Sequence, residues 1–269
     1  MNLFSPIIED QRQHPSFRKI FVPRNRYALD VLTDWARGFV DRDGKFVKEF
    51  QSSFESSFWE LYIFAVLKYF LFTVDFQHNR PDFIITSPTP FIIEATISLN
   101  DSLTKPAHDS EISDIPTDLN TFNEEAIIRL SNSFISKYRK FKSSYAQLGH
   151  VIGKPFLLAI APFDKPFFNM QCQRAIEALL FGYYVDEEAY LKQKDFREKI
   201  KGHEIKEVIK HNGSSIEVGL FNNDRYKEVS AVLFNSCATW GKALALSQDP
   251  NSRSFFTALK QNKSETLPH

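Results

Sequence analysis

Two acidic residues lie in or beside short apolar segments, and their placement limits the fold more than any other feature of the chain. Asp82 directly precedes the segment FIIT at 83–86, and Glu94 lies inside FIIEATIS at 91–98, after the proline-rich turn SPTP at 87–90. Runs of β-branched and aromatic residues bounded by prolines predict two strands joined by a turn. An ionised carboxylate among buried strands costs on the order of several kcal/mol unless it is paired or binds a metal. The pattern therefore predicts a site.

The register of this hairpin decides whether the two carboxylates face the same side. Because successive residues of a strand point to opposite faces, Asp82 lies opposite Glu94 only if the loop has an odd length, such as 87–89, or contains a bulge. A two-residue loop would place them on opposite faces. With the odd register, the carboxylates can hold one hard cation, with Thr96 on the same face and the carbonyl of Ala95 as a further oxygen ligand.

Glu60 is a third acidic residue in an apolar setting. It lies within a helix that we predict over 49–72, the second half of which is apolar almost all round. An unpaired charge in such a helix is unfavourable. We therefore expect Glu60 to join the other two acids, either as a direct ligand or through water.

A purely structural interpretation of the same residues stays open. In it, Glu60 pairs with Arg80 or Lys68, Asp82 caps a turn, and Glu94 forms a buried ion pair. For any one of these residues alone, short-motif evidence does not separate the two interpretations.

Helices and strands alternate along the rest of the chain. Strands are predicted at 73–76, 83–86, 91–98, 155–162, 215–221 and 229–234, and helices at 26–39, 49–72, 123–148 and 171–184, with a charged helical segment over 186–212. A polar, acidic loop is expected over 99–125. This alternation predicts an α/β fold, organised as a single domain over 1–269 with its core at about 49–185 and a C-terminal elaboration over 186–269.

Composition restricts the classes of partner and the compartment. With 33 basic and 33 acidic residues the net charge is zero, so any polyanion site must be local. The apolar run at 58–76 contains charged residues, which argues against a membrane span. Cys172 and Cys237 are too few for a disulfide framework and are expected to be buried, the seven histidines lack the spacing of a zinc site, and the start of the chain lacks a secretory signal, so we expect a cytoplasmic protein.

The acidic residues and their spacing resemble a known family. Glu60 in a helix, Pro81-Asp82, and then Glu94-Ala95-Thr96 in an apolar strand resemble the PD-(D/E)XK nuclease superfamily, over about 49–98 and more loosely through the strand near 156–161. The resemblance implies a restriction-endonuclease-like mixed sheet flanked by helices, with an αβββαβ core. It also implies that Asp82, Glu94 and the Ala95 carbonyl bind Mg²⁺ or Mn²⁺, that Glu60 assists, and that the substrate is nucleic acid, most simply DNA.

The chain departs from this family at one signature position. Thr96 stands where the family usually has a lysine that orients the attacking water and stabilises developing charge. Some members supply that cation from the next helix. The helix predicted at 123–148 offers Arg129 and Lys137, with Ser133 between them on nearly the same face, and Lys137 is our choice. The alternative is that Lys137 belongs to a solvated basic face at 137–142.

Several functions agree with these features. The first is a metal-dependent nuclease, in restriction or defence by analogy with the family. The second is a catalytically inactive module of the same fold that binds a partner, which the threonine at position 96 and the zero net charge favour. The third is an unrelated enzyme whose acids form ion pairs. Basic residues at 137–142, interleaved with aromatic residues, and at 192–210 are candidate phosphate contacts, and a homodimer is one assembly that the sequence leaves open.

Overall fold

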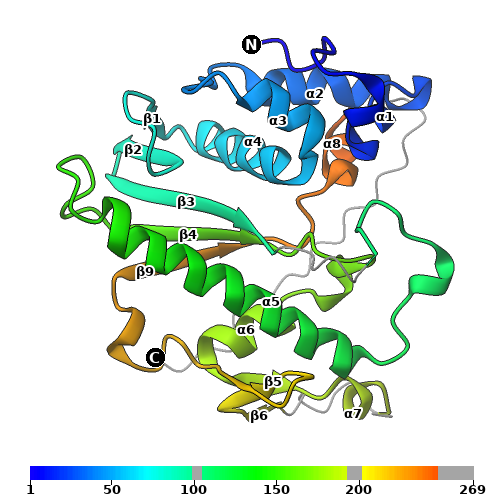
Figure 1. Ribbon diagram of the computed structural model, residues 1–269, viewed down its shortest axis with the longest axis vertical. Coiled ribbons are helices and arrows are strands. Elements are labelled where there is room, and N and C mark those ends of the chain that lie inside the picture. Colours follow the sequence, from blue (N-terminus) through cyan, green and yellow to red (C-terminus); the bar gives the residue numbers. More distant parts are fainter. Residues whose placement is uncertain (99–104, 193–201, 248–269) are drawn as a thin grey trace, which may run out of the picture.

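A mixed five-stranded sheet forms the centre of the molecule in a computed structural model, which describes residues 1–98, 105–192 and 202–247 (Figure 1). The strand order is β1-β2-β3-β4-β9, with bounds Thr73–Asp75 (β1), Phe83–Ser87 (β2), Phe91–Ile97 (β3), Phe156–Ala161 (β4) and Val229–Phe234 (β9). The pairs β1–β2 and β2–β3 are antiparallel, whereas β3–β4 and β4–β9 are parallel. The predicted α/β class is therefore confirmed, and the sheet is mixed.

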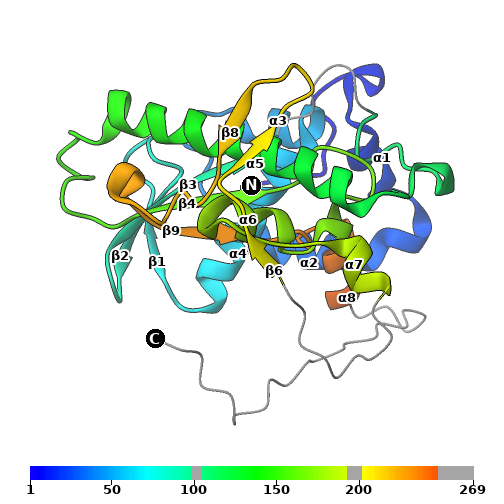
Figure 2. The ribbon, with the colours of Figure 1, turned by 90° about the horizontal axis from the view of Figure 1, so that it is seen from below.

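Helices cover both faces of this sheet (Figures 1 and 2). They are α1 (Pro15–Lys19), α2 (Arg26–Ala36), α3 (Phe46–Ser52), α4 (Phe54–Tyr69), α5 (Leu119–Lys140), α6 (Arg174–Phe181), α7 (Glu187–Lys192) and α8 (Trp240–Leu246). α4 packs on one face, with α1, α2, α3 and α8 beyond it, and α5 and α6 pack on the other. From α4 to β4 the order is α4-β1-β2-β3-α5-β4, which is the predicted αβββαβ order.

The alternation of side chains along β2 and β3 explains why both faces are apolar. Phe83 and Ile93 point into the core shared with α4, while Ile84 and Ile92 point into the core shared with α5 and α6. Strands that are buried on both faces read as continuous apolar runs instead of alternating ones. Glu94, two residues after Ile92, therefore faces α5 and is the one charged residue of a largely apolar strand.

The long helix predicted over 49–72 is two helices. α3 ends at Ser52 and α4 begins at Phe54, because Ser53 has a non-helical backbone with φ −132° and ψ 46°. The apolar pattern continues through the break, since Phe50 and Phe54 are both buried and their rings lie 5.1 Å apart. Periodicity alone therefore could not reveal it.

The boundaries of the later helices also differ from prediction. α5 begins at Leu119, four residues before the expected start, because the Asp118 side chain accepts hydrogen bonds from the amides of Asn120 and Thr121. It continues into a π-helical turn at Phe141–Tyr145. α6 ends at Phe181, three residues before the predicted end, because Gly182 stops it in a left-handed conformation with φ +65°.

The C-terminal part contains more strands than predicted. Two small antiparallel ribbons pair β5 (Tyr183–Val185) with β6 (Gly202–Glu204) and β7 (Glu207–Ile209) with β8 (Ser215–Glu217). The helical prediction for 186–212 is therefore wrong at β6 and β7 and correct only at α7, and residues 193–201 lie outside the described part. The strand predicted at 229–234 is β9, which extends the main sheet beside β4.

None of the described helices is both long enough and apolar enough to cross a lipid bilayer.

Replacing Phe156 by alanine tests the packing of α5 on the sheet. Phe156 is 1% exposed, and its ring stacks on that of Phe141 at a centroid distance of 4.1 Å. We expect Phe156→Ala to lower the free energy of unfolding by about 3–5 kcal/mol, the usual cost of removing a buried phenylalanine ring. Urea unfolding would measure this, with the exposed Phe70→Ala as a control expected to change stability by less than about 0.5 kcal/mol. Equal effects of the two variants would contradict the described core.

Candidate functional site

The hairpin has the register that places Asp82 and Glu94 opposite each other. Phe83 pairs with Ile93, Ile84 with Ile92 and Ile85 with Phe91. Asp82 precedes the first of these pairs, so the same register places it opposite Glu94. Of the two registers that the sequence leaves open, the structure has the odd one, which brings the two acids to the same face.

Asp82 lies just before the start of β2 and bonds to β3 through its side chain, where a strand residue would use its backbone. Pairing of β2 with β3 stops at Phe83, and the next amide along β3 that needs a partner on this side is that of Ala95. Asp82 Oδ2 accepts this hydrogen bond at 2.7 Å. A buried amide without a partner is costly, so the bond fixes the carboxylate beside Glu94.

Glu94 is the most buried acid of the group and is held by two lysines of α5. It is 1% exposed, and its Oε1 accepts hydrogen bonds from Lys137 Nζ at 2.8 Å and Lys140 Nζ at 3.1 Å. The two lysines are three residues apart and therefore lie on the same side of the helix. Both bind Oε1, so Oε2 accepts neither ammonium group.

Charge and burial act in opposite directions on this pair. Burial alone would raise the pKa of Glu94, but Lys137 and Lys140 more than offset this and lower it. Burial alone would likewise lower the pKa of Lys137, but the negative charges of Glu94 and Asp82 raise it overall. Both groups are therefore ionised near neutral pH, and removing either partner would leave a buried charge uncompensated.

Asp82 and Glu60 have the opposite tendency. Burial and the charge of Glu94 raise the pKa of Asp82 to about 6. Burial and then the charge of Asp82 raise the pKa of Glu60 to about 8, against the opposing effect of Lys137. The three acids and Lys137 thus act on one another, as expected of groups that share a site.

A small pocket of about 160 Å³ opens beside these acids. Glu60 and Asp82 line it together with Arg42 and Asn79. Arg42 Nη1 donates to the carbonyl oxygens of His78 at 2.5 Å and Pro81 at 3.0 Å, which fixes the segment before Asp82. The pocket gives Asp82 and Glu60 a route to solvent from an otherwise buried position.

The structural alternatives for the acids are met only in part. Lys68 pairs with Asp34 at 3.8 Å, and no ion pair of Glu60 with Lys68 or Arg80 is present among the described residues. Glu94 does form the buried ion pair that the alternative foresaw. The structure therefore places Glu60, Asp82, Glu94 and Lys137 together, while their catalytic roles stay predictions.

Arg129, the other cation considered on the same helix, is engaged elsewhere. Its Nη1 lies 2.5 Å from Asp164 Oδ2. Ser133, between it and Lys137, donates to the carbonyl oxygen of Ile97 at 3.2 Å. Of the two cations named from the sequence, Lys137 is thus the one that binds an acid of the candidate site.

The basic run at 137–142 is less free to contact phosphates than the sequence indicates. Lys142 and the hydroxyl of Tyr138 both bind the Glu228 carboxylate. Phe141 and Tyr145 are buried in the core and cannot stack on bases. Much of the second basic run, 192–210, lies outside the described residues.

Both cysteines correct a prediction. Cys172 and Cys237 are exposed, not buried. The prediction rested on the general tendency of free cysteine residues to be buried, which neither position follows. Neither lies among the residues of the candidate site.

Sequence reasoning missed three residues near the acids. Lys140 could have been found, because it lies one turn from Lys137 on the same helix. Arg42 could not, because it is distant in sequence and lies in a loop. The third residue is Tyr145. Burial and the charge of Glu94 raise the pKa of its hydroxyl, which makes no hydrogen bond of normal geometry within the described part.

The donor set fits Mg²⁺ better than a softer metal. Asp82 and Glu94 offer carboxylate oxygens, and Mg²⁺ binds proteins through one or two carboxylates while keeping several waters. Within the described ranges, Glu60, Asp82 and Glu94 are not a set of three acids whose ligand oxygens all lie within 4.8 Å of one another. Direct binding by Asp82 and Glu94, with Glu60 acting through water, agrees with this spacing, and the Ala95 carbonyl stays a predicted ligand.

In comparisons with known proteins, no family model, curated protein or solved structure matches this chain.

The raised pKa of Glu60 predicts a pH dependence of stability. Between its unfolded value near 4.5 and its folded value of about 8, the native state keeps a proton that the unfolded chain has lost. Stability therefore falls as pH rises through this window. We expect Glu60→Gln to remove this contribution to the fall and to be more stable than wild type at pH 8 by on the order of 4 kcal/mol, with no difference below pH 4.

Urea unfolding from pH 4 to 8, in buffer containing EDTA, measures this difference. Glu9→Gln, at an exposed position, is the matched control and should follow the wild-type curve. Parallel curves for wild type and Glu60→Gln across the whole range would show that Glu60 titrates normally.

Proposed function

We propose that this protein is a metal-dependent phosphodiesterase of the restriction-endonuclease-like fold, acting on nucleic acid, most simply DNA. The observation that carries the proposal is the position of Lys137, whose Nζ lies 2.8 Å from Glu94 in a site shared with Asp82. A cation from α5 thus lies beside the two acids, which supports a role for it in hydrolysis of a phosphodiester, although position 96 is a threonine. In this proposal, Lys137 performs the role that the family usually gives to a lysine at position 96.

The element order supports the same proposal. Glu60, Glu94 and Lys137 come from α4, β3 and α5, and Asp82 immediately precedes β2. Residues on rigid helices and strands hold a site more precisely than residues on loops. An αβββαβ order with its acids at these positions agrees with the resemblance seen in the sequence.

The residues divide the work of hydrolysis between them. Asp82 and Glu94 would hold Mg²⁺, which supplies charge neutralisation at phosphorus and an activated water. The Ala95 amide keeps Asp82 oriented through its hydrogen bond. Lys137 would move from Glu94 toward the phosphate as the cation binds, and would stabilise the charge that develops on its oxygens.

Local positive charge allows a neutral chain to bind a polyanion here. The Lys140 side chain is 45% exposed, and Arg80 is exposed beside Asp82. His150 Nε2 lies 2.7 Å from the Arg80 carbonyl oxygen, and its ring stacks on that of His78 at 3.8 Å. Basic and planar side chains of this kind suit a phosphodiester backbone.

A non-catalytic binding module is the second candidate. The observation that favours it is that Glu94 is already neutralised by two lysines, so the ion pair is complete without a metal. In this case the acids and lysines would serve the fold alone. The absence of cleavage together with unchanged stability in Mg²⁺ would favour this module.

Nuclease assays on single- and double-stranded DNA and RNA with Mg²⁺ or Mn²⁺ test the proposal. We expect Asp82→Asn and Lys137→Met each to lower cleavage by about 10²-fold or more, because each removes a charge that acts in the transition state. The amide side chain of the Asp82→Asn variant keeps an oxygen for the Ala95 amide, so this variant is expected to fold. EDTA should abolish cleavage by the wild type.

Lys142→Met is the matched control for Lys137→Met. Lys142 lies in the same basic run but pairs with Glu228. Its loss should change cleavage by less than about threefold if Lys137 acts specifically at the site and not through general attraction of the polyanion. Full activity of Asp82→Asn and Lys137→Met, with folding confirmed by circular dichroism, would refute the nuclease proposal.

A further inference from the structure

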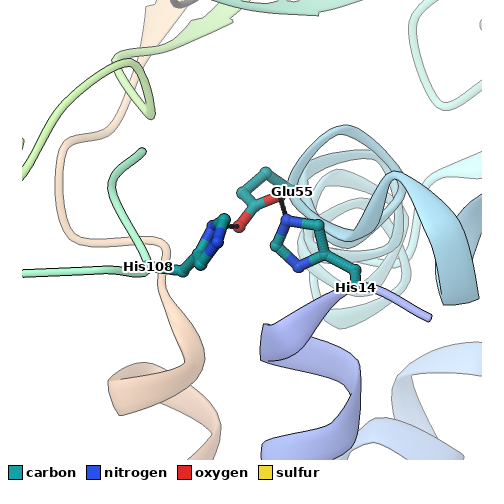
Figure 3. Close-up of side chains that lie close together, drawn as sticks. All are labelled: His14, Glu55 and His108. Carbon is teal, nitrogen blue, oxygen red and sulfur yellow. Dashed lines mark ion pairs between the residues drawn. The ribbon is translucent and has the colours of Figure 1, made fainter. Parts of the chain in front are cut away.

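We propose that His14, Glu55 and His108 form a second metal site, which binds a divalent transition metal of the Zn²⁺ class. The three side chains come from separate segments, since His14 precedes α1, Glu55 lies in the first turn of α4, and His108 lies in the segment before α5 (Figure 3). One ligand atom from each lies within 4.8 Å of the others. Two imidazoles and a carboxylate are a donor set that suits zinc and its neighbours.

The distances are close to those that tetrahedral coordination requires. His14 Nε2 lies 3.1 Å from Glu55 Oε2, and His108 Nδ1 lies 3.8 Å from Glu55 Oε1. Zinc bonds of about 2.0–2.1 Å at tetrahedral angles separate ligand atoms by roughly 3.3 Å. Figure 3 shows both imidazole rings directed at the Glu55 carboxylate. The two contacts end on different oxygens of Glu55, so a rotation of the carboxylate and of the imidazole rings is needed to bring one ligand atom of each residue around one ion.

The hydrogen bonds of His14 determine which of its two ring nitrogens carries the proton. His14 Nδ1 accepts a hydrogen bond from the Ser16 amide at 3.1 Å and caps α1, so without metal the ring proton is on Nε2, facing Glu55. A metal can bind Nε2 only when this nitrogen carries no proton. Metal binding therefore moves the ring proton to Nδ1, which can then no longer accept the hydrogen bond that caps α1. One capping hydrogen bond is a small part of the free energy with which proteins bind zinc.

Neighbouring groups already hold both Glu55 and His108 in place. Ser16 Oγ donates to Glu55 Oε1 at 3.2 Å, and Lys19 Nζ donates to the carbonyl oxygen of His108 at 3.1 Å. The rings of His14 and His108 meet edge to face at 4.4 Å. Hydrogen bonds of this kind to ligands hold metal sites in shape.

A pocket beside the cluster provides room for a fourth ligand. It has a volume of about 300 Å³ and is lined by Glu55, His108 and several aromatic rings, among them Phe163 and Trp240. Three protein ligands with one open position are the arrangement of catalytic zinc sites, whereas structural sites have four protein ligands. We therefore assign the fourth position to water or to a small ligand held in this pocket.

This site is distinct from the one proposed for hydrolysis. Glu55 and Glu60 both belong to α4, but five residues of a helix separate them by about 7.5 Å along its axis and about 140° around it. The donors differ as well, since nitrogen ligands favour a transition metal and an all-oxygen set favours Mg²⁺. The two sites can therefore be tested independently.

Titration with Co²⁺ and Zn²⁺ tests the second site. The protein would carry Asp82→Asn, so that the carboxylate site does not contribute, and the visible absorption of Co²⁺ reports nitrogen ligation and geometry. We expect one ion per chain, displacement of Co²⁺ by Zn²⁺, and a shift of the His14 ring proton from Nε2 to Nδ1 in ¹⁵N NMR spectra.

Substitution of the ligands completes the test. Three single variants are compared: His14→Asn, which keeps a side-chain cap for α1, His108→Gln and Glu55→Gln. Each should weaken Co²⁺ binding by at least 100-fold. His211→Gln, at a side chain that is 88% exposed, is the control and should bind as the parent does. Absence of Co²⁺ binding at micromolar concentrations, or binding that these three substitutions leave unchanged, would overturn the proposal.

Discussion

The ion pair between Glu94 and the lysines of α5 is the constraint on which the site depends. A carboxylate that is 1% exposed in the middle of an apolar strand needs a counter-charge, and Lys137 and Lys140 provide it. α5 must therefore cross the sheet with its C-terminal turns above Glu94. This requirement places a cation from a helix beside two acids from a hairpin, so that satisfying the buried charge and assembling the site are the same event.

The parts of the fold that could be predicted are those with a local pattern. The two strands of the hairpin follow from the apolar runs on either side of the proline turn, whereas the sequence leaves their register open, and Lys137 follows from its position on the helix after β3. The break at Ser53 could not be predicted, because the buried phenylalanines continue through it. Likewise, nothing local joins His14, Glu55 and His108, which lie far apart in the sequence and meet only through the packing of their separate segments.

Acidic and basic groups are segregated at the candidate site, although the chain as a whole is neutral. Acids gather in the interior beside β3, where burial favours the protonated forms of Asp82 and Glu60. Basic groups of α5 and of the segment before β2 stand around them. A cation bound by the acids would displace these protons as the neutralising charge, so proton loss and cation uptake at this site are linked processes.

The position of β9 has a consequence for how the protein can be divided. β4 is paired on one side with β3 and on the other with β9, which arrives from a segment almost seventy residues later. All six residues of β4 are apolar, and its backbone groups on the second side have β9 as their partner. A fragment ending after α6 would carry this strand as an open, uncharged edge, the kind that pairs with other chains and aggregates. β9, which lies outside the αβββαβ order, thus covers this edge of β4 and protects the sheet from association through it.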